Sequence, residues 1–402
     1  MTKLLESSLY YHTVRYDQDD APIDTEQSER IILRLNKTLA TEQQDPEVWN
    51  NLGVAQGNLG RYEEALTSFK HALQLKPDYH EAWYNQGVTL GKLGYHEETL
   101  SSYDHALHLK PDYYEAWINQ GAVLGSLGRY EEALLCFDHA LQFKLNLYEI
   151  WHNRGLVLGN LGRYEEALTS YDYALELEPN LHETWYNQGV VLGKLGYHEE
   201  ALSSYDHALQ LKPDSYEAWI NRGAELMYLG RWEEALSSFD HTLELKPNLY
   251  QAWHNRGMVL GNLGHYEEAL VSFDRALQFK PDYYQVWERR GIVLRELGRW
   301  EEAISSFEKA NAQDAVEATL IAIIQRRLPS EEQEKFSYLV DKIETDDLTE
   351  VEHSEFMVYV ERVEREDAER AKALVKLAQI RNVEPMTVLN EFLPKANHTD
   401  AV

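Results

Sequence analysis

The chain has 402 residues, 44% of them hydrophobic, which is enough for a folded core and excludes a largely disordered protein. Its 38 basic and 68 acidic residues give a formal net charge of −30, which argues against a surface for nucleic acid or anionic lipid. The single cysteine, Cys136, excludes an internal disulfide framework, and no segment approaches the roughly 18 apolar residues of a membrane span. We therefore expect a cytoplasmic protein with no nucleic-acid partner and no membrane insertion.

The N-terminal region divides into two parts. Residues 1–23 are expected to be poorly structured. From Asp24 onwards, apolar residues at helical spacing predict a helix within residues 24–45. This helix is expected to cap the open end of the array that follows.

Tryptophan then recurs every 34 residues, from Trp49 to Trp287, and marks eight copies of one unit. With each tryptophan counted as position 4, every copy has glycine at position 8, Leu-Gly at positions 14 and 15, and Glu-Glu at positions 18 and 19. Position 24 is aromatic, positions 20 and 27 are alanine or threonine, and proline closes six copies at position 32. The copies span residues 46–79, 80–113, 114–147, 148–181, 182–215, 216–249, 250–283 and 284–317.

Each copy predicts two antiparallel helices. Positions 4, 8 and 11 share one face of the first helix, and positions 20, 24 and 27 share one face of the second. The glycine at position 15 suits a left-handed cap between the two helices. Position 33 and the glutamate at position 2 of the next copy have capping-box spacing, so this glutamate is expected to be mainly structural. The four joints are Asp78 with Glu81, Asp112 with Glu115, Asn146 with Glu149, and Asn180 with Glu183.

These residues at these offsets resemble the tetratricopeptide repeat family. The near-identical copies resemble arrays common in bacteria, cyanobacteria especially. The resemblance implies an all-α, right-handed superhelical solenoid of antiparallel helix pairs, closed by N- and C-terminal capping helices. Leu145 and Ala315 depart from the family pattern, since they replace the proline at position 32.

Three C-terminal segments follow the repeats. An apolar run predicts a capping helix at residues 318–329, residues 330–393 are expected to form a helical hairpin, and residues 394–402 a tail. Ser330 with Gln333 and Thr349 with Glu352 have capping-box spacing. A separate partner-binding module and a plain extended cap both fit the hairpin.

Groups that could carry chemistry have structural explanations. No phosphate-binding loop, nucleophile elbow or zinc-protease helix is present, so we expect no catalytic residue, no cofactor and no metal. Cys136 replaces the serine of the other copies, and the repeated Glu-Glu pairs suit helix N-termini better than acid–base catalysis. His105 and His108 are close enough in sequence to share a metal, but a surface pair is the simpler interpretation.

One face of the first helix is not required by the predicted core. Positions 2, 6, 9 and 13 lie roughly opposite the buried stripe, and position 6 is asparagine in seven copies although asparagine is a poor helix former. In superhelical members of the family, asparagines at this offset form a ladder that binds the backbone of an extended peptide. The alternative is that they bond between neighbouring repeats or to water. The seven are Asn51, Asn85, Asn119, Asn153, Asn187, Asn221 and Asn255.

Position 5 varies and is expected to give selectivity. It carries the triplet Tyr84, Ile118 and His152, which recurs as Tyr186, Ile220 and His254. Residues 80–181 and 182–283 are duplicates, which indicates either segmental duplication alone or a ligand with two similar segments. Position 2 is Glu or Gln throughout, so the lysine-based carboxylate clamp of some family members is not predicted.

The sequence therefore predicts a non-enzymatic scaffold that binds extended peptide segments of other proteins through an asparagine ladder in a groove. The alternative is an assembly-factor or substrate-presenting arm for a separate enzyme or membrane complex. Binding centred on residues 330–393 would favour that alternative.

Overall fold

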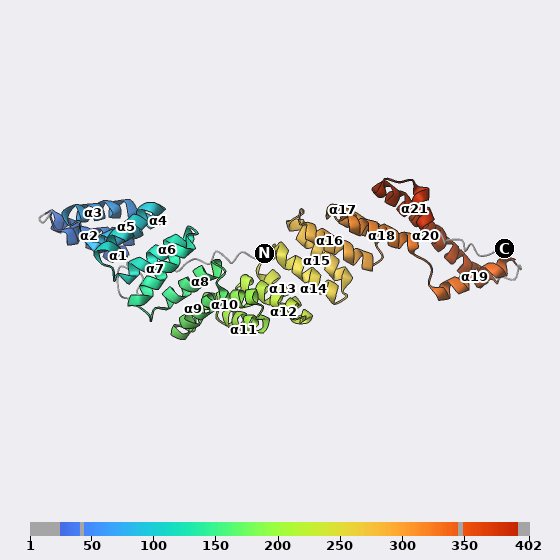
Figure 1. The fold of residues 1–402 in the computed structure, drawn as a ribbon, viewed down its shortest axis with the longest axis horizontal. Helices are drawn as coiled ribbons and strands as arrows, with labels where there is room; N and C mark the ends of the chain where they lie inside the picture. The colour runs from blue at the N-terminus through green and yellow to red at the C-terminus, as the bar shows by residue number, and fades with distance from the viewer. Residues whose placement is uncertain (1–24, 41–43, 345–348, 393–402) are drawn as a thin grey trace, which may run out of the picture. The chain divides into compact units, whose positions relative to one another are not determined.

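The computed structural model describes residues 25–40, 44–344 and 349–392, and every regular element in these ranges is an α-helix (Figure 1). The predicted all-α fold of tandem helix pairs is thereby confirmed. Our expectations for residues 1–23 and 394–402 fall outside the described ranges. The helices group into two compact units, Met1–Gly230 and Arg231–Val402.

The first unit holds the N-terminal helix and the helices of the first five copies, followed by the first helix of the sixth. Its helices are α1 (Thr25–Leu39), α2 (Pro46–Asn58), α3 (Tyr62–Leu75), α4 (His80–Lys92), α5 (His96–Leu109), α6 (Tyr114–Ser126), α7 (Tyr130–Phe143), α8 (Tyr148–Asn160), α9 (Tyr164–Leu177), α10 (His182–Leu195), α11 (His198–Leu211) and α12 (Tyr216–Tyr228).

The second unit holds the remaining repeat helices and the C-terminal segments. Its helices are α13 (Trp232–Leu245), α14 (Tyr250–Asn262), α15 (Tyr266–Phe279), α16 (Tyr284–Glu296), α17 (Trp300–Lys309), α18 (Gln313–Gln325), α19 (Ser330–Glu344), α20 (Glu350–Arg381) and α21 (Pro385–Phe392).

Two glycines in each copy set the geometry of the helix pair. The glycine at position 15 has φ between 72° and 83° in all eight copies, which confirms the predicted left-handed cap. The glycine at position 8 lies against the aromatic ring at position 24: a Cβ built on Gly155 would come within 2.6 Å of the Tyr171 ring. Because a real Cβ essentially never comes that close, glycine is what lets the two helices approach.

The tryptophan at position 4 joins neighbouring copies. Its indole nitrogen donates a hydrogen bond to the carbonyl of position 32 in the preceding copy, as in Trp83 to Pro77 at 2.9 Å. Trp151 makes the same bond to Leu145, so the loss of proline there leaves the contact intact. The indole also stacks on the residue at position 26, for example His105 on Trp83 with ring centroids 4.3 Å apart. Ring stacking therefore accounts for the recurrent histidine at position 26.

Position 7 ties three helices together. Arg154 of α8 donates to Asp138 of α7 at 2.8 Å and to Ser170 of α9 at 2.8 Å. Arg256 and Arg290 make the equivalent pair of bonds in the second unit. Arginine at position 7 thus gives polar bonds between neighbouring copies.

The glutamates at positions 2 and 19 have different surroundings. Glu132, at position 19, forms a two-bond ion pair with Arg129, with both bonds 2.7 Å long, which gives it a structural role. The predicted capping boxes at position 2 are wrong, because each of these helices begins one residue later than the boxes require. Their N-cap residues are Tyr79, Tyr113, Leu147 and Leu181, and no side chain caps these four helix ends.

The C-terminal helices depart from the repeat pattern at Asn311. This residue has φ of 57°, so α17 ends after 10 residues and α18 begins at Gln313, earlier than the predicted residue 318. The capping box of Thr349 and Glu352 at the start of α20 is confirmed. Helix α20 packs on α18 and, through Glu366, places one carboxylate near the guanidinium groups of three arginines.

Candidate functional site

The first helices of neighbouring copies contact one another within each unit. In the first unit the contacts run α2 to α4, α4 to α6, α6 to α8, α8 to α10 and α10 to α12, and in the second unit α14 contacts α16. The residues at positions 2, 5 and 6 of these helices therefore lie along a shared surface in each unit, which we call the first-helix face.

The predicted asparagines are buried to different extents on this face. Asn51 is exposed, and Asn221 and Asn255 are half-buried. The expectation that position 6 lies outside the core is wrong for the other four, because side chains of neighbouring copies enclose them. These are Asn85, Asn119, Asn153 and Asn187, with relative exposures of 7%, 2%, 0% and 1%.

Three of the seven asparagines at position 6 donate a hydrogen bond to the preceding copy. Asn119 Nδ2 donates to the hydroxyl of Tyr84 at 3.0 Å, and Asn221 Nδ2 donates to the hydroxyl of Tyr186 at 2.9 Å. Asn85 donates to Asn50 at 3.1 Å. Each bond runs from position 6 to position 5 of the preceding copy. These three amide nitrogens therefore bond between neighbouring repeats, which is the alternative to a peptide-binding ladder.

Two buried amides nevertheless keep a free polar atom. Among the described residues, Asn119 Oδ1 and Asn187 Nδ2 have no hydrogen-bond partner. A buried polar group left unpaired costs about 1–3 kcal/mol. Both atoms are enclosed, so a ligand reaches them only where the neighbouring side chains move aside.

Position 5 is more deeply packed than its variability suggested. Ile118 and His152 are fully buried, and Ile220 is half-buried. His152 Nδ1 lies 2.7 Å from Thr184 Oγ1 of the next copy. In these copies the residue at position 5 contributes to the joint between repeats, which limits what it offers to a ligand.

Burial also lowers the pKa of two histidines at position 5. The pKa of His152 falls to about 3, and that of His254 falls to about 4, where the charge of Arg289 adds to the effect of burial. His254 also lies near the rings of Phe273 and Tyr283. Both histidines are neutral at pH 7.

We expect acid to destabilise the second unit through His254. Between pH ~6.5 and about 4 the unfolded chain binds a proton that the folded chain does not, so stability rises with pH and is lost as pH falls through this window. The loss is at most ~1.4 kcal/mol per pH unit. Urea denaturation at pH 7 and pH 5 should show a smaller change in the free energy of unfolding for His254→Tyr than for the native chain. Tyrosine is the natural residue at position 5 in copies 2 and 5. His139→Tyr, at an exposed site, is the control, and an unchanged pH dependence in His254→Tyr would contradict the prediction.

Other polar groups are accounted for by packing. Burial raises the pKa of the Cys136 thiol to about 12, so it stays protonated at neutral pH. His105 Nδ1 lies 2.7 Å from the carbonyl of Ser101 while its ring stacks on Trp83. Within residues 25–40, 44–344 and 349–392, no group of three or more His, Cys, Asp or Glu side chains is placed to hold a metal ion.

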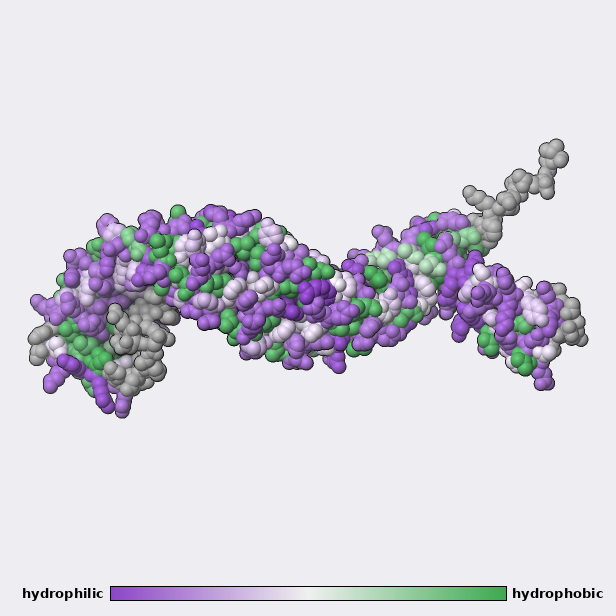
Figure 2. Space-filling view, turned by 90° about the horizontal axis from the view of Figure 1, so that it is seen from below, coloured by the Kyte–Doolittle hydropathy of each residue, from purple (hydrophilic) through white to green (hydrophobic). Residues whose placement is uncertain are grey.

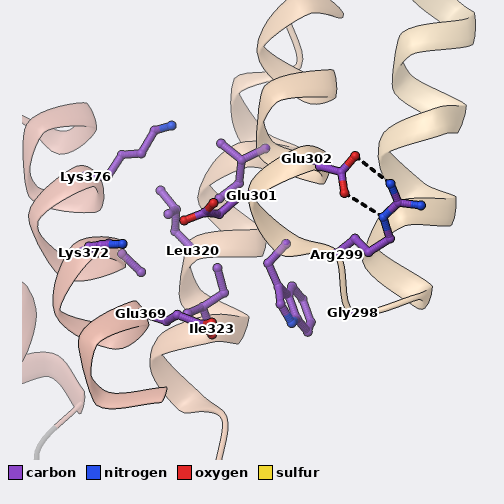
Figure 3. A pocket seen from close by; sticks show the side chains of 12 residues that line it. Gly298, Arg299, Glu301, Glu302, Leu320, Ile323, Glu369, Lys372 and Lys376 are labelled. Atoms are coloured by element: carbon purple, nitrogen blue, oxygen red, sulfur yellow. Dashed lines mark hydrogen bonds and ion pairs between the residues drawn. The ribbon is translucent and has the colours of Figure 1, made fainter. Parts of the chain in front are cut away.

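Two further features bear on function: the length and polarity of the helices, and a cavity in the second unit. None of the described helices is both long and apolar enough to span a bilayer, and hydrophilic residues predominate on the side shown in Figure 2. The second unit contains a cavity of about 540 Å³ between α17, α18 and α20 (Figure 3). Lys372 of α20 and Leu320 of α18 line it. Ion pairs hold much of its rim, which favours a role in packing; these are Arg299 with Glu302, Lys376 with Glu308, and Arg326 with Glu369.

Sequence models of the tetratricopeptide repeat match the first seven copies. The matches cover residues 46–79, 80–113, 114–146, 148–181, 182–215, 216–249 and 250–283. The chain belongs to the tetratricopeptide repeat family. No curated protein sequence matches it.

Several solved structures of tetratricopeptide repeat proteins are similar to this chain. YrrB, described as having an unusual peptide-binding site, is 27% identical over 46% of this chain and 96% of its own, with a TM-score of 0.43. A protein from Parabacteroides merdae is 19% identical over 60% and 98%, with a TM-score of 0.46. MamA from Desulfovibrio magneticus is 20% identical over 42% and 96%, with a TM-score of 0.41.

Sequence reasoning placed position 2 on the same stripe as position 6 but gave its glutamates only a capping role. The glutamates at position 2 were assigned to helix capping, but Glu149 and Glu183 do not cap their helices, and Oε2 of each is enclosed without a hydrogen-bond partner. Their spacing of four residues from Asn153 and Asn187 was visible in the sequence and places them on the same side of the helix.

Proposed function

We propose that this tetratricopeptide repeat protein is a non-enzymatic scaffold that binds extended peptide segments of other proteins on the first-helix face. The repeat architecture is typical of protein-interaction scaffolds. The asparagines at position 6 hold the peptide backbone, because an amide offers both a donor and an acceptor to a peptide group of any sequence. The peptide lies along the first helices of the first unit, where the asparagines repeat most regularly.

The observation that carries this proposal is the pair of free atoms Asn119 Oδ1 and Asn187 Nδ2. Their residues are 2% and 1% exposed, yet these atoms bond to no described group. A backbone N–H and a backbone C=O are the groups that every extended segment provides at regular intervals. A segment that displaces the side chains covering these two atoms would relieve the cost of leaving them unpaired.

The test is selection of random 12-residue peptides against the full chain, followed by fluorescence anisotropy with a selected peptide. Alanine at both Asn119 and Asn187 is expected to weaken binding about tenfold, since two hydrogen bonds are lost. The matched control replaces Asn146 and Asn180, two exposed asparagines at position 33 that lie outside the first helices. Failure to select any peptide, or equal affinity in the folded Asn119 and Asn187 variant, would overturn the proposal.

The second candidate function is an assembly or substrate-presenting arm formed by α19 and α20. The observation in its favour is a set of apolar side chains left exposed there: Tyr338 at 53%, Val351 at 78% and Val358 at 66%. Crosslinks to a partner complex concentrated on residues 330–393 would favour this function over binding on the first-helix face.

We place this scaffold in the cytosol, because its single cysteine is a free, buried thiol that suits a reducing compartment. Cell fractionation of the source organism tests this placement.

A further inference from the structure

The first-helix face of the first unit carries a row of carboxylates beside its asparagines. Position 2 is four residues before position 6, so the two side chains project from the same side of each helix. The last two copies differ, since Gln251 and Gln285 occupy position 2 there. The carboxylates belong to Glu47, Glu81, Glu115, Glu149, Glu183 and Glu217.

Most of the unpaired polar atoms on this face are acceptors. Oε2 of Glu149, Oε2 of Glu183 and Asn119 Oδ1 are enclosed acceptors without a hydrogen-bond partner among the described residues, and Asn187 Nδ2 is an enclosed donor without one. Asn119 and Asn187 are themselves 2% and 1% exposed, so water has little access to these amides. An ionised carboxylate only accepts hydrogen bonds, so Glu149 and Glu183 call for a ligand that brings N–H groups beyond those of a neutral backbone.

We infer that copies 3 to 5 recognise a segment that carries lysine or arginine side chains, with Glu149 and Glu183 as the residues that bind them. This inference rests on the proposed function, in which the asparagines hold the backbone of the same segment. A charge-assisted hydrogen bond from an ammonium or guanidinium group to a partly buried carboxylate is stronger than a neutral one. A metal ion does not fit these residues, because the described residues provide no cluster of three ligands.

Geometry sets the spacing of the basic residues. Glu149 and Glu183 occupy equivalent positions on the neighbouring helices α8 and α10. Packed helices lie ~8–10 Å apart, and an extended chain rises ~3.1–3.3 Å per residue. In a segment with polyproline II conformation, which has three residues per turn, basic side chains three residues apart lie on the same side and match the two carboxylates.

The chain itself supplies a conservative substitution for the test. Copy 7 is the duplicate of copy 4, and it repeats Trp-His-Asn-Arg at positions 4 to 7 with Gln251 in place of Glu149. Copy 8 likewise has Gln285 at the position of Glu183. Both helices form normally with glutamine there, so Glu→Gln at position 2 removes the charge and keeps the fold.

The experiment selects random 12-residue peptides against three full-length proteins: the native chain, Glu149→Gln with Glu183→Gln, and a control with Glu63→Gln and Glu267→Gln. The control removes two exposed carboxylates from second helices and changes the net charge equally. We expect peptides from the native chain and from the control to be enriched in Lys or Arg three residues apart. This enrichment should be absent with the Glu149 and Glu183 variant.

Affinity of one selected basic peptide gives the second measurement. Its Kd is expected to be about tenfold weaker for each of Glu149 and Glu183 replaced, and close to the native value for the control. Selected peptides without basic residues, or equal weakening in variant and control, would overturn this inference while leaving peptide binding intact. Selection of no peptide at all would instead overturn the proposed function together with it.

Discussion

Replacing Phe137 with alanine is expected to lower the free energy of unfolding of the first unit by ~3–5 kcal/mol, the usual cost of emptying a fully buried aromatic site. The ring is 0% exposed, and a Cβ built on Gly121 would lie 2.9 Å from it. Helices α6 and α7 approach each other across this contact. The cavity left by alanine would therefore open directly between the two helices of copy 3.

Urea denaturation followed by circular dichroism measures this effect. Leu135→Ala is the matched control, because Leu135 lies on the same helix but is 60% exposed. The control should change stability by no more than about 0.5 kcal/mol. Equal stabilities of the two variants would contradict the view that the ring at position 24 forms the centre of each helix pair.

Replacing Glu366 with alanine is expected to lower the local stability of α20, including its contact with Arg326 at the end of α18, by about 3 kcal/mol. Glu366 is 7% exposed and lies 3.7 Å from Arg326, 3.2 Å from Arg362 and 3.7 Å from Arg370. Removal of one partner from a buried ion pair leaves its counter-charge uncompensated, which costs roughly 3–5 kcal/mol. The lower end applies here, since the three guanidinium groups are partly solvated and have other carboxylate partners.

Hydrogen exchange of the backbone amides of α20, in the native chain and in the Glu366 variant, measures this local loss of stability. We expect amides near Ala373 and Leu377, on the helix that packs against α18, to lose protection while the helices of the first unit keep theirs. Glu364→Ala, an exposed glutamate two residues away, should leave the exchange pattern unchanged. Uniform loss of protection along the whole chain would contradict a local role for Glu366.

The agreement between sequence and structure is best inside one copy. The helix pair, the left-handed glycine at position 15 and the contact of glycine with an aromatic ring all depend on residues fewer than 20 positions apart. Such local contacts are encoded by spacing alone, and eight repetitions remove chance matches. The capping boxes were wrong because the true N-cap is one residue later, and one-residue shifts at helix ends lie below what spacing resolves.

Agreement between sequence and structure is poorer at Asn311, where a single residue ends one helix and lets the next begin. An asparagine in the left-handed region ends α17 early, so α18 starts inside the predicted eighth copy. Asparagine tolerates this conformation but does not require it. The sequence therefore indicated an apolar capping helix without locating its start.

The sequence by itself determined the family, the helix pairs and the row of asparagines, because each of these follows from the identity of residues at fixed offsets. Only the tertiary structure decided which polar atoms on the first-helix face are free. Asn119 Nδ2 is occupied by Tyr84 of the preceding copy, whereas Asn119 Oδ1 and Oε2 of Glu149 bond to no described residue. The hydrogen bonding of a buried side chain depends on which groups of the neighbouring repeat lie within about 3 Å of it. Residue spacing within one copy does not determine these contacts.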